Sequence, residues 1–181
     1  MTDQDRLADP CAAANRLPQG SGIILRNYGD TDRPRLAAAL SRICRARGLI
    51  LLVAGDGGLA AKVGAHGLHL PEYAAAQAGP WSRRHRNWLI TTAAHSARAL
   101  RHAAQAGAHA ALLSPVFPTD SHPKAKALGP LQFARLTRRS RLPVYGLGGI
   151  DSTNARLLKM SGAVGIAGIS GIADGQPVSA D

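Results

Sequence analysis

Two glycine-rich segments late in the chain have residue types and spacing that could bind an anion. One runs over residues 146–151 (GLGGID) and the other over residues 165–171 (GIAGISG), and each begins within or just after a short apolar run. Glycine lets the backbone approach a bound anion closely, and backbone N–H groups are typical phosphate ligands. The sequence therefore predicts two phosphate-binding loops.

The apolar runs before these loops belong to a series of seven expected strands. The runs are nearly continuous instead of alternating, which is typical of parallel strands buried on both faces. They cover residues 22–26, 49–53, 67–70, 88–91, 110–114, 143–147 and 164–168.

Segments with helical periodicity lie between the runs. The clearest covers residues 31–47, with Thr31 or Asp32 as the capping residue, Pro34 in the first turn and Gly48 after the last. Further helices are expected over residues 95–106, 130–140 and 152–160. A repeated strand–helix unit predicts a parallel sheet covered by helices.

An open doubly wound sheet and a closed barrel both fit this alternation. No G-x-G-x-x-G motif follows the first run, so the dinucleotide-binding signature of the open fold is missing. Barrels commonly hold phosphate in the loops after their last two strands, which is where the glycine segments lie. We therefore predict an α/β fold of the (β/α)8 barrel type, formed by a single domain over residues 1–181.

Composition excludes several classes of protein. The chain has 181 residues, of which 45% are apolar and 18% charged, as in a globular domain. It contains no apolar run of about 20 residues, so no membrane association is expected. Cys11 and Cys44 lie far apart in the sequence and do not suggest a disulfide framework, which favours a cytoplasmic location.

The excess of positive charge indicates an anionic partner. Lys and Arg number 22 against 11 Asp and Glu, giving a formal net charge of +11. The arginines are spread over every expected helix, aromatic residues make up only 4%, and no nucleic-acid-binding motif accompanies them. We therefore expect small phosphorylated substrates and no nucleic acid.

Five segments resemble motifs of the thiamine phosphate synthase/TenI family. They are GIILR (22–26), VGAHGLHL (63–70), LSPVFPT (113–119), PVYGLGGI (143–150) and GAVGIAGISG (162–171). The resemblance implies a (β/α)8 barrel that joins hydroxymethylpyrimidine diphosphate to a thiazole phosphate and releases pyrophosphate. The family's tautomerase branch is disfavoured, because its catalytic histidine aligns with Pro115, which cannot transfer a proton.

The same resemblance implies roles for individual residues. Arg26 would bind the diphosphate, a role that suits its guanidinium fork, and Thr119 would contact substrate near the reacting atoms. Four residues would hold the thiazole phosphate: Gly148, Gly149, Ser170 and Gly171.

The sequence departs from the family at the diphosphate and metal positions. Tyr28 replaces a lysine, and the family's Asn-Asp metal motif aligns with Ala54-Gly55, one position before Asp56. Asp56 and Glu72 are the candidate Mg²⁺ ligands at shifted positions, and His122 replaces another lysine. Lys124 and Lys126 in the same loop could also supply a cation.

Three interpretations remain open on these residues. The first is a synthase whose metal and cation roles have moved, and the second is a catalytically silent protein that keeps the phosphate loops. The third is a different phosphate-substrate barrel, since phosphate loops recur across barrels with unrelated chemistry. The PVFPT segment (115–119) argues against the third.

Seven strands are one fewer than a complete barrel needs. Residues 1–3 resemble the end of the family's first strand, so we expect either a true truncation or a start codon placed too far downstream. The segment 171–181 is too short for a full closing helix. Unpaired strand edges favour dimerisation, a partner chain or reduced stability. Of these, we expect a homodimer.

Overall fold

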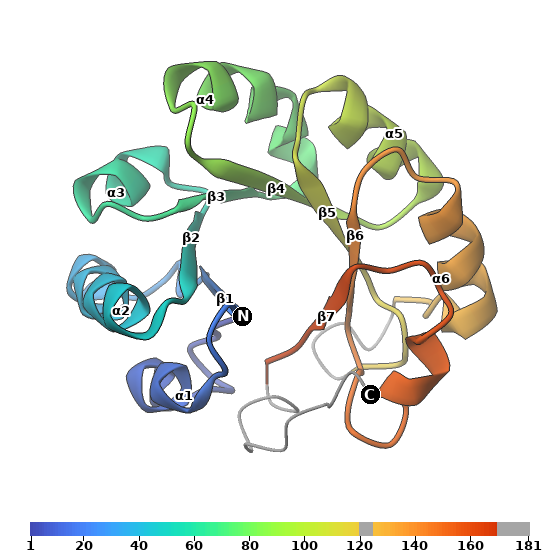
Figure 1. The fold of residues 1–181 in the computed structure, drawn as a ribbon, viewed down its shortest axis with the longest axis horizontal. Coiled ribbons are helices and arrows are strands. Elements are labelled where there is room, and N and C mark those ends of the chain that lie inside the picture. The colour runs from blue at the N-terminus through green and yellow to red at the C-terminus, as the bar shows by residue number, and fades with distance from the viewer. Residues whose placement is uncertain (120–124, 170–181) are drawn as a thin grey trace.

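A single sheet of parallel strands, in sequence order, forms the centre of the computed structural model, which describes residues 1–119 and 125–169 (Figure 1). All seven expected strands are present. They are β1 (Gly22–Leu25), β2 (Ile50–Ala54), β3 (Gly67–Leu70), β4 (Leu89–Ala94), β5 (Ala110–Leu113), β6 (Val144–Leu147) and β7 (Gly165–Ala167). The sheet curls into an incomplete (β/α)8 barrel, which confirms the predicted fold class.

Helices cover the outer face of the curled sheet (Figure 1). The α-helices are α1 (Pro10–Arg16), α2 (Arg33–Arg47), α3 (Gly57–Lys62), α4 (Ala78–Arg84), α5 (Ala97–Gln105) and α6 (Gly129–Arg138). Two 3₁₀ helices, η1 (Glu72–Gln77) and η2 (Ala155–Leu158), complete the described elements. α2, α5 and α6 confirm three expected helices, with slightly shorter bounds.

The expected helix over residues 152–160 was wrong, because only the 3₁₀ helix η2 forms there. The Asp151 carboxylate accepts the N–H groups of Thr153 at 2.8 Å and Asn154 at 3.1 Å. These contacts are those of a helix cap, and the Ala155 N–H donates to the carbonyl oxygen of Asp151 at 3.0 Å. From Asn154 onward the backbone continues with i to i+3 hydrogen bonds, so the segment tightens into a 3₁₀ helix and does not lengthen into an α-helix.

Both faces of the sheet are buried, as the continuous apolar runs predicted. In β2, Leu51 packs outward against Leu40 of α2, whereas the next residue, Leu52, belongs to an inner cluster with Leu112 of β5. Their exposed fractions are 0% for Leu51 and 4% for Leu52. Neighbouring side chains of a strand point to opposite faces, so a strand without polar alternation must be covered on both.

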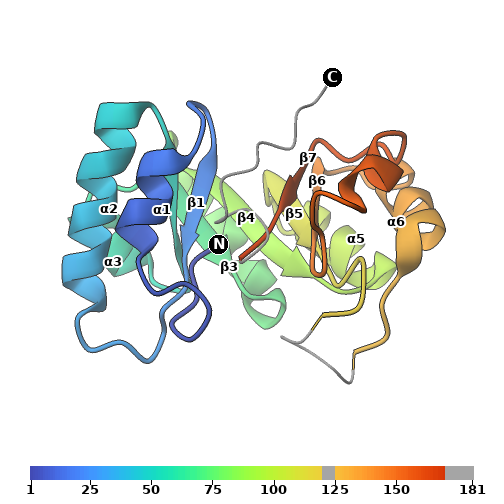
Figure 2. The ribbon, with the colours of Figure 1, turned by 90° about the horizontal axis from the view of Figure 1, so that it is seen from below.

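The gap between the edge strands β1 and β7 is crossed by the first residues of the chain. The N–H of Thr2 donates to the carbonyl oxygen of Ile24 in β1 at 2.9 Å. The Met1 amino group donates to the carbonyl oxygen of Gly168, just after β7, at 2.6 Å. The N-terminus therefore lies within the curve of the sheet, beside β1 (Figures 1 and 2). Burial lowers the pKa of this amino group to about 6.

Three aromatic rings stack where α4 leads into β4. The Trp81 and Trp88 rings lie 5.9 Å apart, and the His85 ring lies 3.8 Å from that of Trp88. Trp88 packs against two buried clusters, one under α2 and one under α4, so the stack joins them.

Within the described part of the chain, every helix is too short or too polar to cross a membrane.

Gly67 of β3 has no room for a side chain. A Cβ atom there would collide with the backbone carbonyl of Leu89 in β4, whereas a Cβ at Gly22 of β1 would meet nothing within 4 Å. We expect Gly67→Ala to lower the free energy of unfolding by about 3 kcal/mol or more, because two paired strands must separate. Gly22→Ala should change it by less than about 1 kcal/mol. Urea unfolding followed by circular dichroism measures both, and equal effects would contradict this account.

Candidate functional site

A cavity of about 360 Å³ opens at the carboxyl ends of the strands. Five of the lining positions follow β1, β4, β5, β6 and β7, which brings together residues far apart in the sequence. The polar and glycine residues in its wall are Arg6, Arg26, His95, Ser114, Thr119, Gly148, Gly149 and Gly168. Active sites of parallel barrels lie at this end of the sheet.

The carbonyl groups of the loop after β6 are bound by other parts of the chain. The carbonyl oxygen of Gly148 accepts the Phe117 N–H at 3.0 Å, and that of Gly149 accepts the Asn154 side-chain amide at 2.8 Å. No acceptor for the N–H groups of Gly148 or Gly149 is found among residues 1–119 and 125–169. The loop can therefore donate both N–H groups to an anion in the cavity.

This backbone geometry requires glycine. Gly148 and Gly149 have φ angles of +97° and +62°, which residues with a Cβ rarely adopt. A Cβ on Gly149 would also lie 2.9 Å from the carbonyl oxygen of Phe117.

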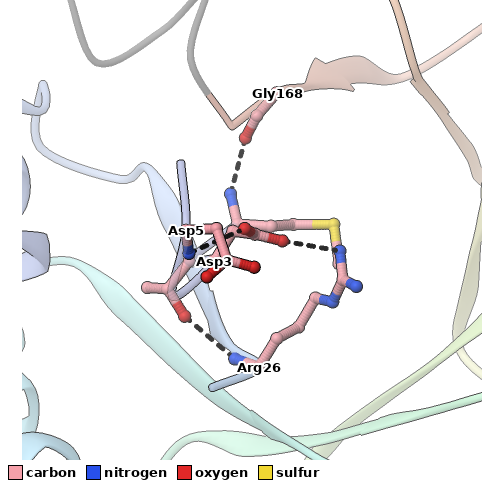
Figure 3. A network of polar contacts seen from close by, with 6 residues as sticks. Asp3, Asp5, Arg26 and Gly168 are labelled. Atoms are coloured by element: carbon pink, nitrogen blue, oxygen red, sulfur yellow. Dashed lines mark hydrogen bonds and ion pairs between the residues drawn. The ribbon is translucent and has the colours of Figure 1, made fainter. Parts of the chain in front are cut away.

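Arg26 is the first residue after β1, and its backbone is fixed by the chain's first residues. Its N–H donates to the Thr2 hydroxyl at 2.9 Å. Its Nη1 lies 3.9 Å from a carboxylate oxygen of Asp3, in an ion pair whose side chains are 30% and 21% exposed (Figure 3). A long, partly exposed ion pair is weak, so the guanidinium can exchange this partner for a stronger anion.

His95 follows β4 and is held on two sides. Its backbone N–H donates to the Glu72 carboxylate at 2.8 Å, and its Nδ1 lies 2.8 Å from the carbonyl oxygen of Ser114. A carbonyl oxygen only accepts hydrogen bonds, so Nδ1 is the donor in this contact. The Ser114 hydroxyl lies 3.3 Å from the same nitrogen, which leaves Nε2 for a molecule in the cavity.

Arg33, at the start of α2, crosses the carboxyl ends of β1 and β2. Its guanidinium donates to the carbonyl oxygen of Ala54 at 2.5 Å and packs 5.2 Å from the ring centroid of Tyr28. It also lies 3.8 Å from a carboxylate oxygen of Asp56. The other Asp56 oxygen caps α3 by accepting the Leu59 N–H at 2.8 Å. Both oxygens of Asp56 therefore already face donors.

Asp56 and Glu72, the candidate Mg²⁺ ligands, do not fit a metal site as the structure places them. Neither lines the cavity, and Glu72 Oε2 accepts the His95 N–H. Across the described residues, no group of three or more His, Cys, Asp or Glu side chains could hold a metal ion. Carboxylates that already face a cation or N–H donors are poor ligands for Mg²⁺, which prefers several free oxygens.

The remaining candidate residues divide into two groups. Thr119 lines the cavity together with Arg26, Gly148 and Gly149. Lys126 is exposed in the loop that leads into α6. His122, Lys124, Ser170 and Gly171 lie outside the described residues.

Sequence reasoning assigned no role to Arg6 or His95, although both line the cavity. His95 had a positional signal, since it directly follows β4 and so lies at the carboxyl ends of the strands. Arg6 had none, because it belongs to no motif and reaches the cavity through the turn between residue 3 and α1.

His69 of β3 is buried at the inner face, with an exposed fraction of 4%. Its Nδ1 lies 2.9 Å from the Thr91 hydroxyl. Burial, and then the nearby Arg26 charge, lower the pKa of His69 from 6.5 to about 4. The ring is therefore neutral at physiological pH and is not a cation for a bound ligand.

Comparisons with known proteins show which family this chain is similar to. A family model described as thiamine monophosphate synthase matches residues 3–172. The thiamine-phosphate synthase of Thioalkalivibrio sulfidiphilus is 33% identical over 92% of this chain and 81% of its own. That of Geobacillus kaustophilus is 34% identical over 78% of this chain and 65% of its own. The solved structure of thiamine phosphate pyrophosphorylase from Pyrococcus furiosus has a similar fold, with a TM-score of 0.77, 24% identity, and coverage of 97% of this chain and 86% of that one.

The neutral state of His69 makes stability depend on pH. Between pH 6.5 and about 4 the unfolded chain binds a proton at His69 that the folded chain does not, so stability falls as pH falls. Between pH 7 and pH 4, we expect the free energy of unfolding of His69→Gln to fall by about 3 kcal/mol less than that of the wild type. The control is His102→Gln, on the exposed side of α5, which should keep the wild-type dependence. Urea unfolding over this pH range measures the difference, and parallel curves for His69→Gln and wild type would refute the assignment.

Proposed function

Because the chain belongs to the thiamine monophosphate synthase family, we propose that it is a transferase of thiamine biosynthesis. It joins hydroxymethylpyrimidine diphosphate to a thiazole phosphate and releases pyrophosphate. The observation that carries this proposal is the presence of two different anion-binding groups in one cavity, a glycine loop and an arginine. Two phosphorylated substrates that react with each other need two such groups facing a shared space.

The glycine loop suits the thiazole phosphate. Gly148 and Gly149 line the cavity, and their N–H groups have no acceptor among the described residues. Their carbonyl groups accept hydrogen bonds from other parts of the chain. Phosphate oxygens accept such N–H donors without any need for a charged side chain. We assign Ser170 and Gly171 to the same phosphate on the family resemblance.

Arg26 suits the diphosphate across the cavity. When the bond between the pyrimidine carbon and the diphosphate oxygen breaks, pyrophosphate leaves with the electron pair and its negative charge increases. A fixed guanidinium stabilises that charge more in the transition state than in the bound substrate, which is the condition for catalysis. Thr119, on the same wall, would contact the substrate near the reacting carbon, and His122 would add a cation.

Mg²⁺ remains a prediction from the family resemblance. Asp56 and Glu72 face other donors, so no step of the reaction is assigned to a metal ion held by them. The homodimer and the cytoplasmic location also remain predictions.

A catalytically silent phosphate-binding protein is the second candidate. It is favoured by the engagement of Asp56 with Arg33 and by Tyr28 at the position of a family lysine. Such a protein would bind a thiazole phosphate at the glycine loop and form no product.

We expect Arg26→Ala to lower kcat/KM for thiamine phosphate formation by about 100-fold or more, because a charged donor to the leaving pyrophosphate is lost. Thiamine phosphate converted to thiochrome is measured by fluorescence. Arg84→Ala, an exposed arginine at the end of α4, removes the same charge and should leave the rate unchanged. Absence of product from the folded wild-type protein, with and without Mg²⁺, would favour the silent binding protein.

We expect Gly149→Ala to raise KM for the thiazole phosphate by about 10-fold or more while changing KM for the pyrimidine diphosphate by less than about 2-fold. The added Cβ displaces the loop that donates to the phosphate. Gly22→Ala is the matched control, because its Cβ meets nothing. An equal rise in both KM values would show that Gly149 shapes the whole cavity and not one phosphate site.

A further inference from the structure

The cavity is lined by two arginine side chains, Arg6 and Arg26, and by no carboxylate among its described residues. His95 also lines it. The two carboxylates that could have held a metal nearby are bound to other groups. The positive charge that faces a ligand in this cavity therefore comes from arginine side chains.

Arg6 reaches the cavity because of a short turn. The Leu7 N–H donates to the carbonyl oxygen of Asp3 at 3.1 Å, which closes one turn of chain over residues 3–7. The same turn presents Asp3 to Arg26 (Figure 3). Arg6 and Arg26 both line the cavity, from neighbouring segments of the chain. Guanidinium groups suit the oxygens of neighbouring phosphoryl groups because each carries several N–H donors.

The position of Arg33 explains why Asp56 is a poor metal ligand. Its guanidinium lies against Asp56 and the carbonyl oxygen of Ala54, at the carboxyl end of β2. The Arg33 side chain is 12% exposed and that of Asp56 is 45% exposed, so this is a long ion pair that solvent reaches from the carboxylate side. The guanidinium still supplies positive charge beside the carboxylate, where a metal ion would otherwise supply it.

We propose that the diphosphate is bound by the guanidinium groups of Arg6 and Arg26 and that its binding does not require a divalent metal ion. This inference rests on the proposed function for the identity of the anion. It adds Arg6 as a binding residue and replaces metal coordination with side-chain charge.

The test is binding of inorganic pyrophosphate, measured by isothermal titration calorimetry. For the wild-type protein we expect the Kd in EDTA to lie within about 3-fold of the Kd in excess Mg²⁺. Arg6→Ala and Arg26→Ala should each weaken binding in EDTA by about 10-fold or more, since each removes a charge-assisted pair of hydrogen bonds. Arg84→Ala, with the same loss of charge at an exposed position of α4, should bind like the wild type.

Two results would overturn the inference. One is binding that disappears in EDTA and returns with Mg²⁺, and the other is unchanged pyrophosphate binding by Arg6→Ala. Circular dichroism of each variant establishes that it is folded before binding is compared.

Thiamine phosphate synthesis is measured separately, so that the two proposals fail independently. Pyrophosphate binding in EDTA without any product would leave the inference standing and refute the synthase. Product formation together with Mg²⁺-dependent pyrophosphate binding would confirm the synthase and refute the inference.

Discussion

The parallel register of the sheet is the constraint on which the rest of the structure depends. Each strand pairs with the next in sequence, so the carboxyl ends of β1 to β7 meet at one rim of the curled sheet. Residues that immediately follow strands, such as Arg26 after β1 and Gly148 after β6, therefore share one cavity. Burial of both faces holds this register, because a shift by one residue would exchange the side chains that face α2 with those inside the curve.

The strands and the location of the site could be predicted from the sequence because both follow from local patterns. Continuous apolar runs identify strands buried on both faces, and a glycine loop after such a run lies at the carboxyl rim. The short helices α1, α3 and α4 have too few turns for a periodic pattern to emerge. The expected helix at residues 152–160 was wrong because the backbone after Asn154 forms i to i+3 hydrogen bonds, a difference from an α-helix that the periodic pattern does not reveal.

The polar contacts of the site depend on tertiary structure, and the sequence could not predict them. Asp56 was a reasonable metal ligand by type and position, yet Arg33 lies beside it because α2 begins directly above the ends of β1 and β2. Likewise, Arg6 becomes part of the cavity only through a turn that places it beside the strand ends. A departure from a family motif thus indicates where the site differs from that of the family. The fold then shows which side chains lie at that position.

The stack of Trp81, His85 and Trp88 determines what intrinsic fluorescence can report. Both tryptophans of the chain lie within 5.9 Å of each other, on the outer side of the sheet between α4 and β4. Their emission is therefore sensitive to one sector of the molecule. The glycine loop and Arg26 lie at the carboxyl rim of other strands, so a fluorophore introduced near them would observe ligand binding separately from the native tryptophan signal.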